Sequence, residues 1–167
     1  MLGRGLAVAA VAAVLDQASK AVLLLHFHEA GCSRHQETIT SFLDLVLTCN
    51  SGVSFGMFNR TGLNSLIFSL LAALVVVVLV FWLTRVRSNL LAAAIGLIIG
   101  GAIGNVVDRL RFGAVVDFLY FHAQSWYWPA FNLADSAICL GVAAILFDGL
   151  LLRRSPPQAK GREDLSP

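Results

Sequence analysis

The sequence has little charge and lacks the common motifs of soluble enzymes. Only 13% of its 167 residues are charged and 57% are hydrophobic, which is too apolar for a soluble domain of this size and indicates a membrane protein. No glycine-rich phosphate loop, His-Glu-x-x-His pair or Gly-x-Ser-x-Gly turn occurs. The net charge of +2 is small and basic residues are not interleaved with aromatic ones, so nothing indicates nucleic-acid binding.

Cysteine is also scarce, and no Cys-x-x-Cys pair is present. The three cysteines are Cys32, Cys49 and Cys139. Cys32 and Cys49 fall in one loop and can pair if that loop faces an oxidising compartment, which the sequence leaves open. His26, His28 and His35 lie in the same loop, but their spacing fits no metal site. We therefore expect no metal ion.

Four stretches are long and apolar enough to cross a bilayer, which requires about 20 residues per helix. They are roughly residues 5–25, 63–84, 90–107 and 131–152. The first has the basic start of a cleaved signal peptide, but apolar sequence resumes at Ala21–Leu25, so we interpret it as a retained helix. In the third, Gly100 and Gly104 have a spacing that allows close helix packing.

Basic residues predict the orientation of these spans. Seven of them lie at Arg4, in the Arg85–Arg87 turn and in the tail, whereas the loops 26–62 and 108–130 hold four. We therefore expect both termini to be cytoplasmic and the two loops to face outward. Residues 1–154 are predicted to form a single membrane domain. Residues 155–167, which contain three prolines and several charges, are predicted to be a disordered cytoplasmic tail.

The first outward loop has the pattern of a small β element. Residues Ile39 to Val46 are rich in β-forming side chains, Asn50-Ser-Gly52 is a turn signal, and Val53–Phe58 alternates apolar with small residues. The predicted fold is thus an all-α membrane protein, a four-helix bundle with a small extracytoplasmic β-hairpin. The second loop ends in Trp126-Tyr-Trp128, which is typical of a membrane-interface anchor.

Two aspartates lie beside apolar spans, where ionisable groups are costly and usually functional. Asp117 precedes the fourth span and Asp135 is near its start. Asn132 is a good helix N-cap and Asp135 complements the helix dipole, so capping alone accounts for that end. Two carboxylates that share one proton can also hydrolyse a peptide bond. The outer end of the third span additionally holds Asn105 and Asp108, and Arg109 follows directly.

Asp16 and Lys20 are four residues apart within the first span and so share one helix face. The simplest interpretation is an internal ion pair, and Lys20 can in addition influence the field at an outward-facing site. Asp108 and Arg109 have a structural alternative as well, since they can hold the chain where it leaves the membrane.

Four blocks in order together resemble the lipoprotein signal peptidases (signal peptidase II), a family of bacterial aspartic peptidases. The blocks are Asp16-Gln-Ala-Ser-Lys20, Asn50-Ser-Gly-Val-Ser-Phe-Gly-Met-Phe58, Gly100 to Arg109 continuing through Gly113-Ala-Val-Val-Asp-Phe118, and Phe131-Asn-Leu-Ala-Asp-Ser136. Each block is weak evidence of membership, but four in this order on a four-span chain are specific.

The resemblance implies a catalytic dyad of Asp117 and Asp135 in the inner membrane. It also implies substrate-binding or supporting roles for Asn50, Gly52, Asn105, Asp108, Arg109, Asn132, Asp16 and Lys20. The implied substrate is a prolipoprotein whose Cys carries diacylglycerol, cut on the amino side of that Cys at the outer face. Membrane lipid and a globomycin-type inhibitor are the other implied partners, and the outer β element is implied to cradle the substrate. The resemblance implies no metal and no organic cofactor.

Two other functions fit parts of the sequence. A small transporter or channel accounts for the charged residues within the first span. Such proteins usually place their polar groups at the midplane and often contain an internal repeat. Here the polar residues cluster at one face, and the two halves of the sequence show no repeat. A non-catalytic membrane scaffold accounts for Asp135 as a cap and Asp108 as an anchor. The scaffold predicts that Asp117→Asn has no effect.

Overall fold

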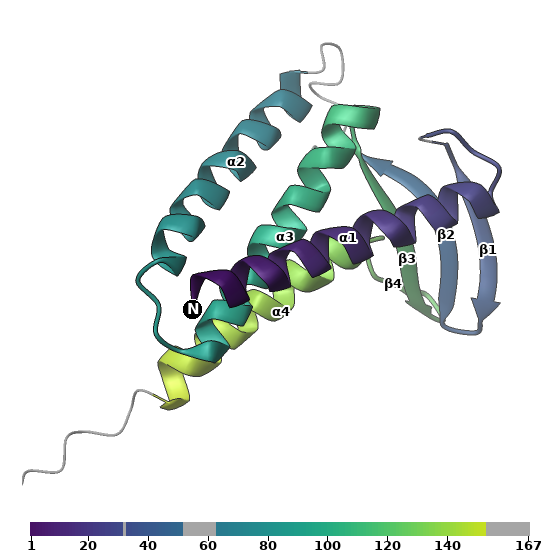
Figure 1. Cartoon of the computed structure of the whole chain (residues 1–167). Coiled ribbons are helices and arrows are strands. Elements are labelled where there is room, and N and C mark those ends of the chain that lie inside the picture. Colours follow the sequence, from purple (N-terminus) through teal and green to yellow (C-terminus); the bar gives the residue numbers. More distant parts are fainter. Residues whose placement is uncertain (32, 52–62, 153–167) are drawn as a thin grey trace, which may run out of the picture.

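The structure is a computed structural model that describes residues 1–31, 33–51 and 63–152. Its helical elements are α1 (Leu2–His26), α2 (Leu63–Leu83), α3 (Asn89–Phe112), α4 (Leu133–Phe147) and a π-helical turn (Asp148–Leu152). Its strands are β1 (His35–Thr40), β2 (Leu43–Asn50), β3 (Val115–Ala123) and β4 (Trp126–Tyr127). The helices form one body, and the sheet lies at one end of it, beside the last turns of α1 (Figure 1).

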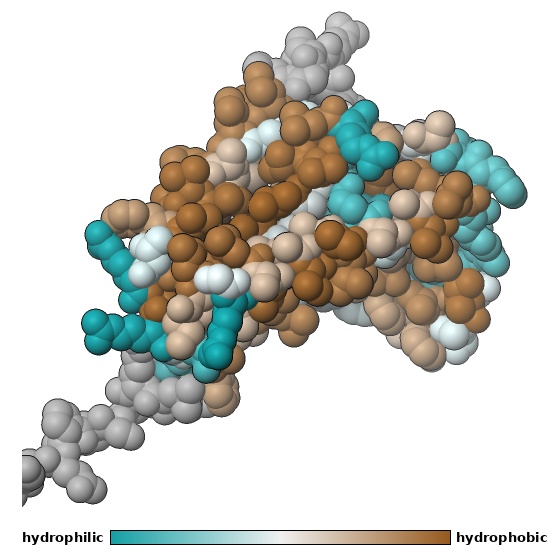
Figure 2. Space-filling model, in the orientation of Figure 1, coloured by the Kyte–Doolittle hydropathy of each residue, from teal (hydrophilic) through white to brown (hydrophobic). Residues whose placement is uncertain are grey.

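Four helices in the described residues are long and apolar enough to cross a membrane, and they occupy the stretches where spans were expected. They cover Leu2–His26, Asn64–Leu83, Asn89–Phe112 and Leu133–Leu150. Hydrophobic side chains dominate the visible surface of the helices, whereas hydrophilic ones gather at the far end of the bundle and on the sheet (Figure 2). Such a surface suits a bundle whose sides face lipid and whose ends face water.

The third helix is longer than the sequence pattern indicated. A span ending near residue 107 was expected, but α3 continues to Phe112 and ends at Gly113, which has a φ of 75°. The left-handed conformation at Gly113 suits glycine and ends the helix. Asp108 lies just beyond the expected end of this span, but it is fully buried and paired inside the protein.

Helix α3 is the centre of the bundle and packs against each of the other three helices. Glycines make this close packing possible. Gly96 and Gly100 lie against the backbone carbonyls of Gly5 and Ala9 in α1, and Gly101 lies against α4. A side chain at any of these three positions would collide with backbone rather than with a movable side chain. Gly104, the partner of Gly100 in the spacing noted in the sequence, lies against the Asp16 carboxylate and the Ala134 side chain, so this spacing serves packing within the chain.

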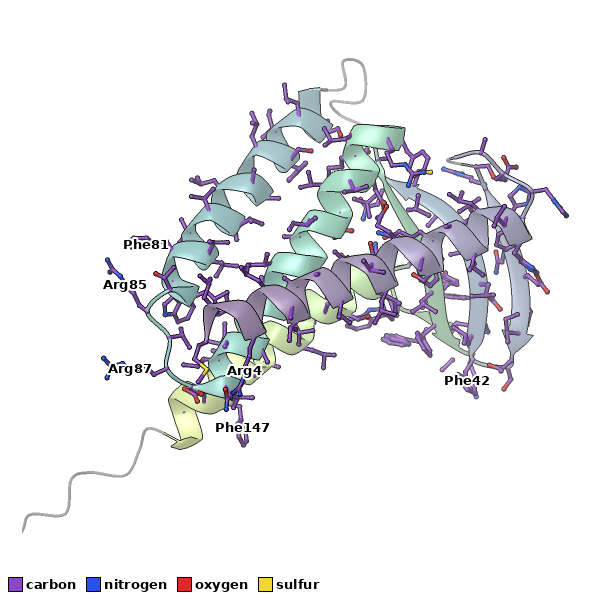
Figure 3. The ribbon with its side chains drawn as sticks, viewed as in Figure 1. Arg4, Phe42, Phe81, Arg85, Arg87 and Phe147 are labelled. Carbon is purple, nitrogen blue, oxygen red and sulfur yellow. The ribbon has the colours of Figure 1, made fainter. Side chains whose placement is uncertain are left out.

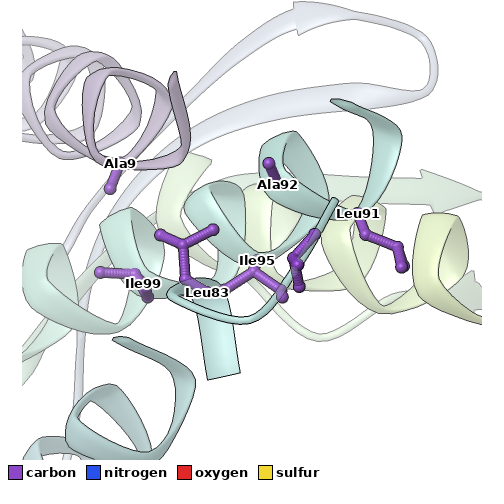
Figure 4. Close-up of a cluster of buried hydrophobic side chains, with 7 residues drawn as sticks. Ala9, Leu83, Leu91, Ala92, Ile95 and Ile99 are labelled. Atoms are coloured by element: carbon purple, nitrogen blue, oxygen red, sulfur yellow. The ribbon is translucent and has the colours of Figure 1, made fainter. Parts of the chain in front are cut away.

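An apolar cluster joins the ends of α1, α2 and α3 away from the sheet (Figure 4). Its buried members are Ala9, Leu83, Val86, Leu91, Ala92, Ile95 and Ile99. Elsewhere α2 is largely exposed. Only 17% of an apolar 18-residue stretch of α2 is buried, compared with 67% of the corresponding stretch of α3. Helix α2 is therefore attached mainly to α3, and most of its surface is left for lipid.

The sheet is larger than the predicted hairpin. Its strands are antiparallel in the order β1-β2-β3-β4, so the chain is not all-α. The β1–β2 turn falls at Ser41–Phe42, within the stretch that was expected to form one strand. The only sequence signal for that turn is a weak one, the threonine at position 40. Its hydroxyl accepts a hydrogen bond from the Phe42 backbone N–H at 3.3 Å. The other expected strand, residues 53–58, lies outside the described residues.

A second apolar cluster attaches the sheet to the outer end of α1. Leu23 and Leu24 of the helix pack with Leu47, Val116 and Phe118 of the sheet, and all five are buried. Val116 and Phe118 are the neighbours of Asp117 on β3. Burial of these two apolar side chains therefore fixes the height and direction of the aspartate between them.

We predict that Gly101→Ala destabilises the bundle, by about 1–3 kcal/mol as for other overpacked cores. The new methyl group would meet the backbone carbonyl oxygen of Ala134, which cannot move without displacing α4. The thermal unfolding midpoint in detergent measures the effect. Gly3→Ala is the control, because its methyl group would meet nothing within 4 Å. Equal midpoints for both variants would contradict the packing role of Gly101.

Candidate active site

Asp117 lies on β3 and is 1% exposed. Its two carboxylate oxygens accept hydrogen bonds from two asparagines. The Asn50 side-chain amide donates to Oδ2 at 3.1 Å, and the Asn132 amide donates to Oδ1 at 2.7 Å. Asn50 comes from the end of β2 and Asn132 from the start of α4. The carboxylate is therefore held from a strand and from a helix.

Asp135 lies in the first turn of α4 and forms a reciprocal capping box with Asn132. The Asp135 backbone N–H donates to Asn132 Oδ1 at 2.9 Å, and Asp135 Oδ2 accepts from the Asn132 backbone N–H at 3.3 Å. The capping interpretation of Asn132 is correct. It does not exclude a role in the site, since the amide of the same asparagine donates to Asp117. One asparagine side chain thus connects the two aspartates.

Asn105 and Arg109 lie one turn apart on α3, on the side facing Asp135. Asn105 donates to Asp135 Oδ1 at 2.9 Å. The Arg109 guanidinium donates to the Asn105 carbonyl at 3.3 Å, and its central carbon is 5.7 Å from the centre of the Phe68 ring. Its Nε is buried and has no hydrogen-bond partner among the described residues. A buried donor without a partner is costly, so this N–H is a candidate ligand-binding group.

Burial raises the pKa of Asp117 from its ordinary value of 3.8 to about 6. The hydrogen bond from Asn50 acts in the opposite direction because it favours the charged form, and the negative charge of Asp135 raises the pKa further. Hydrogen bonding by Asn132 and the positive charge of Lys20 lower it slightly. The net result is a carboxyl group that titrates near neutral pH beside a second carboxyl group, which is the electrostatic arrangement that acid–base catalysis requires.

A buried cluster of charged residues lies beneath the two aspartates. Lys20 Nζ is 2.8 Å from Asp16 Oδ2 and 2.7 Å from Asp108 Oδ2. All three side chains are almost completely buried. The sequence suggested a pair between Asp16 and Lys20, and the structure adds Asp108 as the second carboxylate on the same ammonium group.

Each carboxylate of this cluster also accepts a backbone N–H from the residue just before one of the two aspartates. Asp16 Oδ1 accepts from the Ala134 N–H at 2.9 Å, next to Asp135. Asp108 Oδ2 accepts from the Val116 N–H at 3.1 Å, next to Asp117. The ammonium of Lys20 therefore joins α1 and α3 to the backbone on which both aspartates stand.

Gln17 completes this cluster and was missed in the sequence. Its amide nitrogen is 2.8 Å from Asp108 Oδ1 and 3.2 Å from both Asp16 Oδ2 and the Gly104 carbonyl oxygen. Its carbonyl oxygen accepts from Arg111 at 3.4 Å. The available signal was a polar amide next to Asp16 within an apolar span, which the charged neighbours obscured.

Two hollows meet this region. A groove of about 290 Å³ lies between α2, α3 and α4 and includes Asn105 and Arg109 in its lining. Its other lining residues are apolar: Phe68, Leu71, Ala72, Val75, Ile98, Ala102 and Ile138. A pocket of about 690 Å³ on the sheet is lined by polar and aromatic residues that include Gln36, Thr48, Tyr120 and Tyr127. Thr48 is the strand partner of Asp117, so this pocket begins beside the site.

The other expected groups have separate places. Gly52 lies outside the described residues. His26 and His35 are 2.7 and 2.8 Å from Glu37 and Glu29 on the exposed outer loop and strand. Cys49 is disulfide-bonded, whereas Cys139 is free and exposed. Trp126 and Trp128 are exposed, with ring centres 5.7 Å apart, at the edge of the sheet.

A family model described as signal peptidase (SPase) II matches residues 8–151. The chain belongs to the signal peptidase II family. Among its relatives, the lipoprotein signal peptidase of Rhodopseudomonas palustris strain TIE-1 is 44% identical, over 88% of this chain and 92% of its own. That of Azoarcus sp. strain BH72 is 46% identical, over 92% of this chain and 86% of its own.

The fold of this family member is also found in solved structures. Two structures of bacterial membrane enzymes, determined by the in meso method at 2.3 and 1.9 Å, each superpose with a TM-score of 0.73. They are 25% and 26% identical to this chain, cover 97% and 89% of it, and are themselves covered over 95% and 94% of their lengths. This member of the signal peptidase II family is therefore a peptidase with the fold of a bacterial membrane enzyme.

We predict that Lys20→Met destabilises this peptidase by about 3–5 kcal/mol, because it leaves two buried carboxylates without a cation. Thermal unfolding in detergent measures the loss. The control is His35→Ala, which removes an ion pair whose two side chains are 40% and 33% exposed. Its loss should be much smaller, since exposed pairs contribute little. If both variants unfold at the same temperature, the buried cluster does not stabilise the bundle.

Proposed function

We propose that the chain is an aspartic endopeptidase that removes the signal peptide from diacylglyceryl-modified prolipoproteins. It would cut on the amino side of the lipidated Cys at the outer face of the bacterial inner membrane. The observation on which this depends is the pair Asp117 and Asp135, joined through Asn132 and partly withdrawn from water. Membership of the signal peptidase II family and the names of its relatives support the substrate.

The chemistry uses one ionised and one protonated carboxyl group. The ionised group removes a proton from water, whose oxygen attacks the carbonyl carbon of the scissile peptide, while the protonated group donates its proton to the carbonyl oxygen. The resulting diol collapses, the carbon–nitrogen bond breaks, and a proton passes to the leaving amine. The products are a signal peptide with a new carboxylate and a lipoprotein whose Cys has a free amino group.

Asn50, Asn105, Asn132 and Arg109 are proposed to position the dyad and the substrate. The three asparagine amides donate to the aspartates and so set which oxygens remain available for water. The Nε of Arg109 has no partner among the described residues and is proposed to donate to a carbonyl oxygen of the substrate. Asp16, Lys20 and Asp108 are proposed to support both aspartates from below.

The groove between α2, α3 and α4 is proposed to hold the acyl chains of the substrate. Its walls are apolar and it ends at Asn105 and Arg109, beside Asp135. Lipid in this groove would place the modified Cys at the depth of the dyad, because the end of the groove lies beside Asp135. A globomycin-type inhibitor is proposed to bind at the same end of the groove and cover the aspartates.

The pocket on the sheet is proposed to cradle the polypeptide that follows the lipidated Cys. This segment is the part of the substrate that leaves the membrane, and the pocket combines polar side chains with the rings of Tyr120 and Tyr127. In the proposed orientation the sheet faces outward, because Arg4, Arg85 and Arg87 lie at the opposite end of the bundle (Figure 3).

We predict that Asp117→Asn and Asp135→Asn each lower turnover by at least about 100- to 10,000-fold, as expected for loss of acid–base catalysis. A gel-shift assay with purified protein and a diacylglyceryl-modified prolipoprotein measures cleavage. Asp44→Asn is the matched control, because Asp44 is also a buried carboxylate of the sheet but binds Gln36 and His122. It should retain most of the activity. The scaffold alternative instead predicts no cleavage by any of these proteins.

The raised pKa of Asp117 predicts a particular dependence of stability on pH. A carboxyl group whose folded pKa exceeds its unfolded value favours folding fully only below the unfolded pKa of 3.8, and this contribution is lost as pH rises to about 6. From below the lower value to above the higher one, the wild type should lose about 3 kcal/mol that Asp117→Asn does not lose. Thermal unfolding in detergent across this range tests the slope. Parallel curves would show that Asp117 titrates with an ordinary pKa.

A further inference from the structure

Another hollow lies at the end of the helical bundle opposite the sheet, where α2 connects to α3. It has a volume of about 370 Å³ and is lined by Trp82, Arg85, Val86, Arg87, Ser88 and Leu91. We refer to it as the inner arginine pocket. Its two arginines lie at the end of the bundle opposite Phe42 of the sheet, with Arg4 of α1 at the same end (Figure 3). The peptidase chemistry makes no use of this pocket.

The positive groups of the inner arginine pocket are partly held in place by their neighbours. The guanidinium carbon of Arg85 is 4.1 Å from the centre of the Phe81 ring, a distance typical of a cation–π contact. Nearby, Arg4 Nη1 donates to Asn89 Oδ1 at 2.6 Å. Asn89 is the first residue of α3, which follows the N-cap Ser88. Two of the three arginines are therefore already ordered at the place where α1, α2 and α3 converge.

The charges of these three arginines, Arg4, Arg85 and Arg87, have no acidic partner among the described residues. All three are exposed. The amino end of α3 adds a partial positive charge at the same place. An anion bound there would meet uncompensated positive charge from two arginines and a helix end.

The same place is continuous with an apolar surface. Trp82, Val86 and Leu91 form the apolar side of the pocket. Along α2, away from this end, Val77, Val78 and Phe81 are exposed to the surroundings. A ligand that fits both features has an anionic head and long apolar chains. Free phosphate would satisfy only the arginines.

We propose that the inner arginine pocket binds an anionic phospholipid, with its phosphate between Arg85 and Arg87 and its acyl chains along α2. Basic pockets beside transmembrane helices are suited to such headgroups. The lipid joins α2 to the amino ends of α1 and α3. This matters because α2 packs mainly on α3 and forms one wall of the apolar groove through Phe68 and Leu71. Bound lipid would hold that wall in place.

The test measures the thermal unfolding midpoint of the purified full-length protein in an uncharged detergent. Phosphatidylglycerol, phosphatidylcholine with the same acyl chains, and inorganic phosphate are titrated separately. Phosphatidylglycerol should raise the midpoint in a saturable way, because a ligand that binds only the folded state stabilises it. The other two should have little effect. The double variant Arg85→Gln and Arg87→Gln should lose most of the increase.

Two further variants make the result unambiguous. Replacing both arginines by lysine keeps the charge and should keep part of the increase, even if the glutamine variant folds poorly. Arg34→Gln removes one positive charge beside the sheet and should keep all of it. An equal increase with phosphatidylcholine, an equal increase with inorganic phosphate, or a full increase in the double glutamine variant would each overturn the proposal. Because the readout is stability, the result does not depend on the proposed peptidase chemistry.

Discussion

The buried ammonium group of Lys20 is the interaction on which the site depends. Its nitrogen is 2.8 Å from an Asp16 oxygen and 2.7 Å from an Asp108 oxygen, in the buried interior, where unpaired charge is costly. Each carboxylate then accepts the backbone N–H that precedes Asp135 or Asp117. The Ala134 N–H lies in the first turn of α4, where N–H groups have no partner within the helix, and the Val116 N–H lies in β3. A single cation thus sets the relative position of a helix and a strand that begin some twenty residues apart.

This arrangement explains why the two aspartates have different surroundings although one asparagine binds both. Asp117 is almost fully buried on β3, and this burial raises its pKa. Asp135 lies in the first turn of α4, where it is only partly buried and accepts hydrogen bonds from the Asn132 backbone N–H and the Asn105 amide. The asymmetry arises from the fold, because one residue belongs to a strand and the other to a helix. A pair of this kind is suited to holding one proton between two groups.

The sequence correctly predicted those features that depend only on residues close together in the chain. Apolar length predicted the four helices, and the identity of Asn132 predicted the cap of α4. The sheet was underestimated because β3 pairs with β2, about seventy residues earlier, and the β1–β2 turn contains no glycine, proline or asparagine. The extension of α3 was missed for a similar reason, since the charge of Asp108 is neutralised by a residue of α1. Gln17 was missed because its three acceptors meet only in the folded chain.

The two ends of the bundle are held by different means, and this difference has a consequence for α2. At the sheet end, α1, α3 and α4 are joined by the Lys20 cluster and by asparagine hydrogen bonds, which are directional and tolerate little movement. Helix α2 takes part in the site only through apolar contacts and through the Ser65 hydroxyl, 3.5 Å from the Arg109 carbonyl. Apolar contacts between helices in lipid are weakly directional, because lipid tails are as apolar as the side chains that they replace. The wall of the groove formed by α2 is therefore the part of the site most able to adapt to chains of different length, while the aspartates stay fixed.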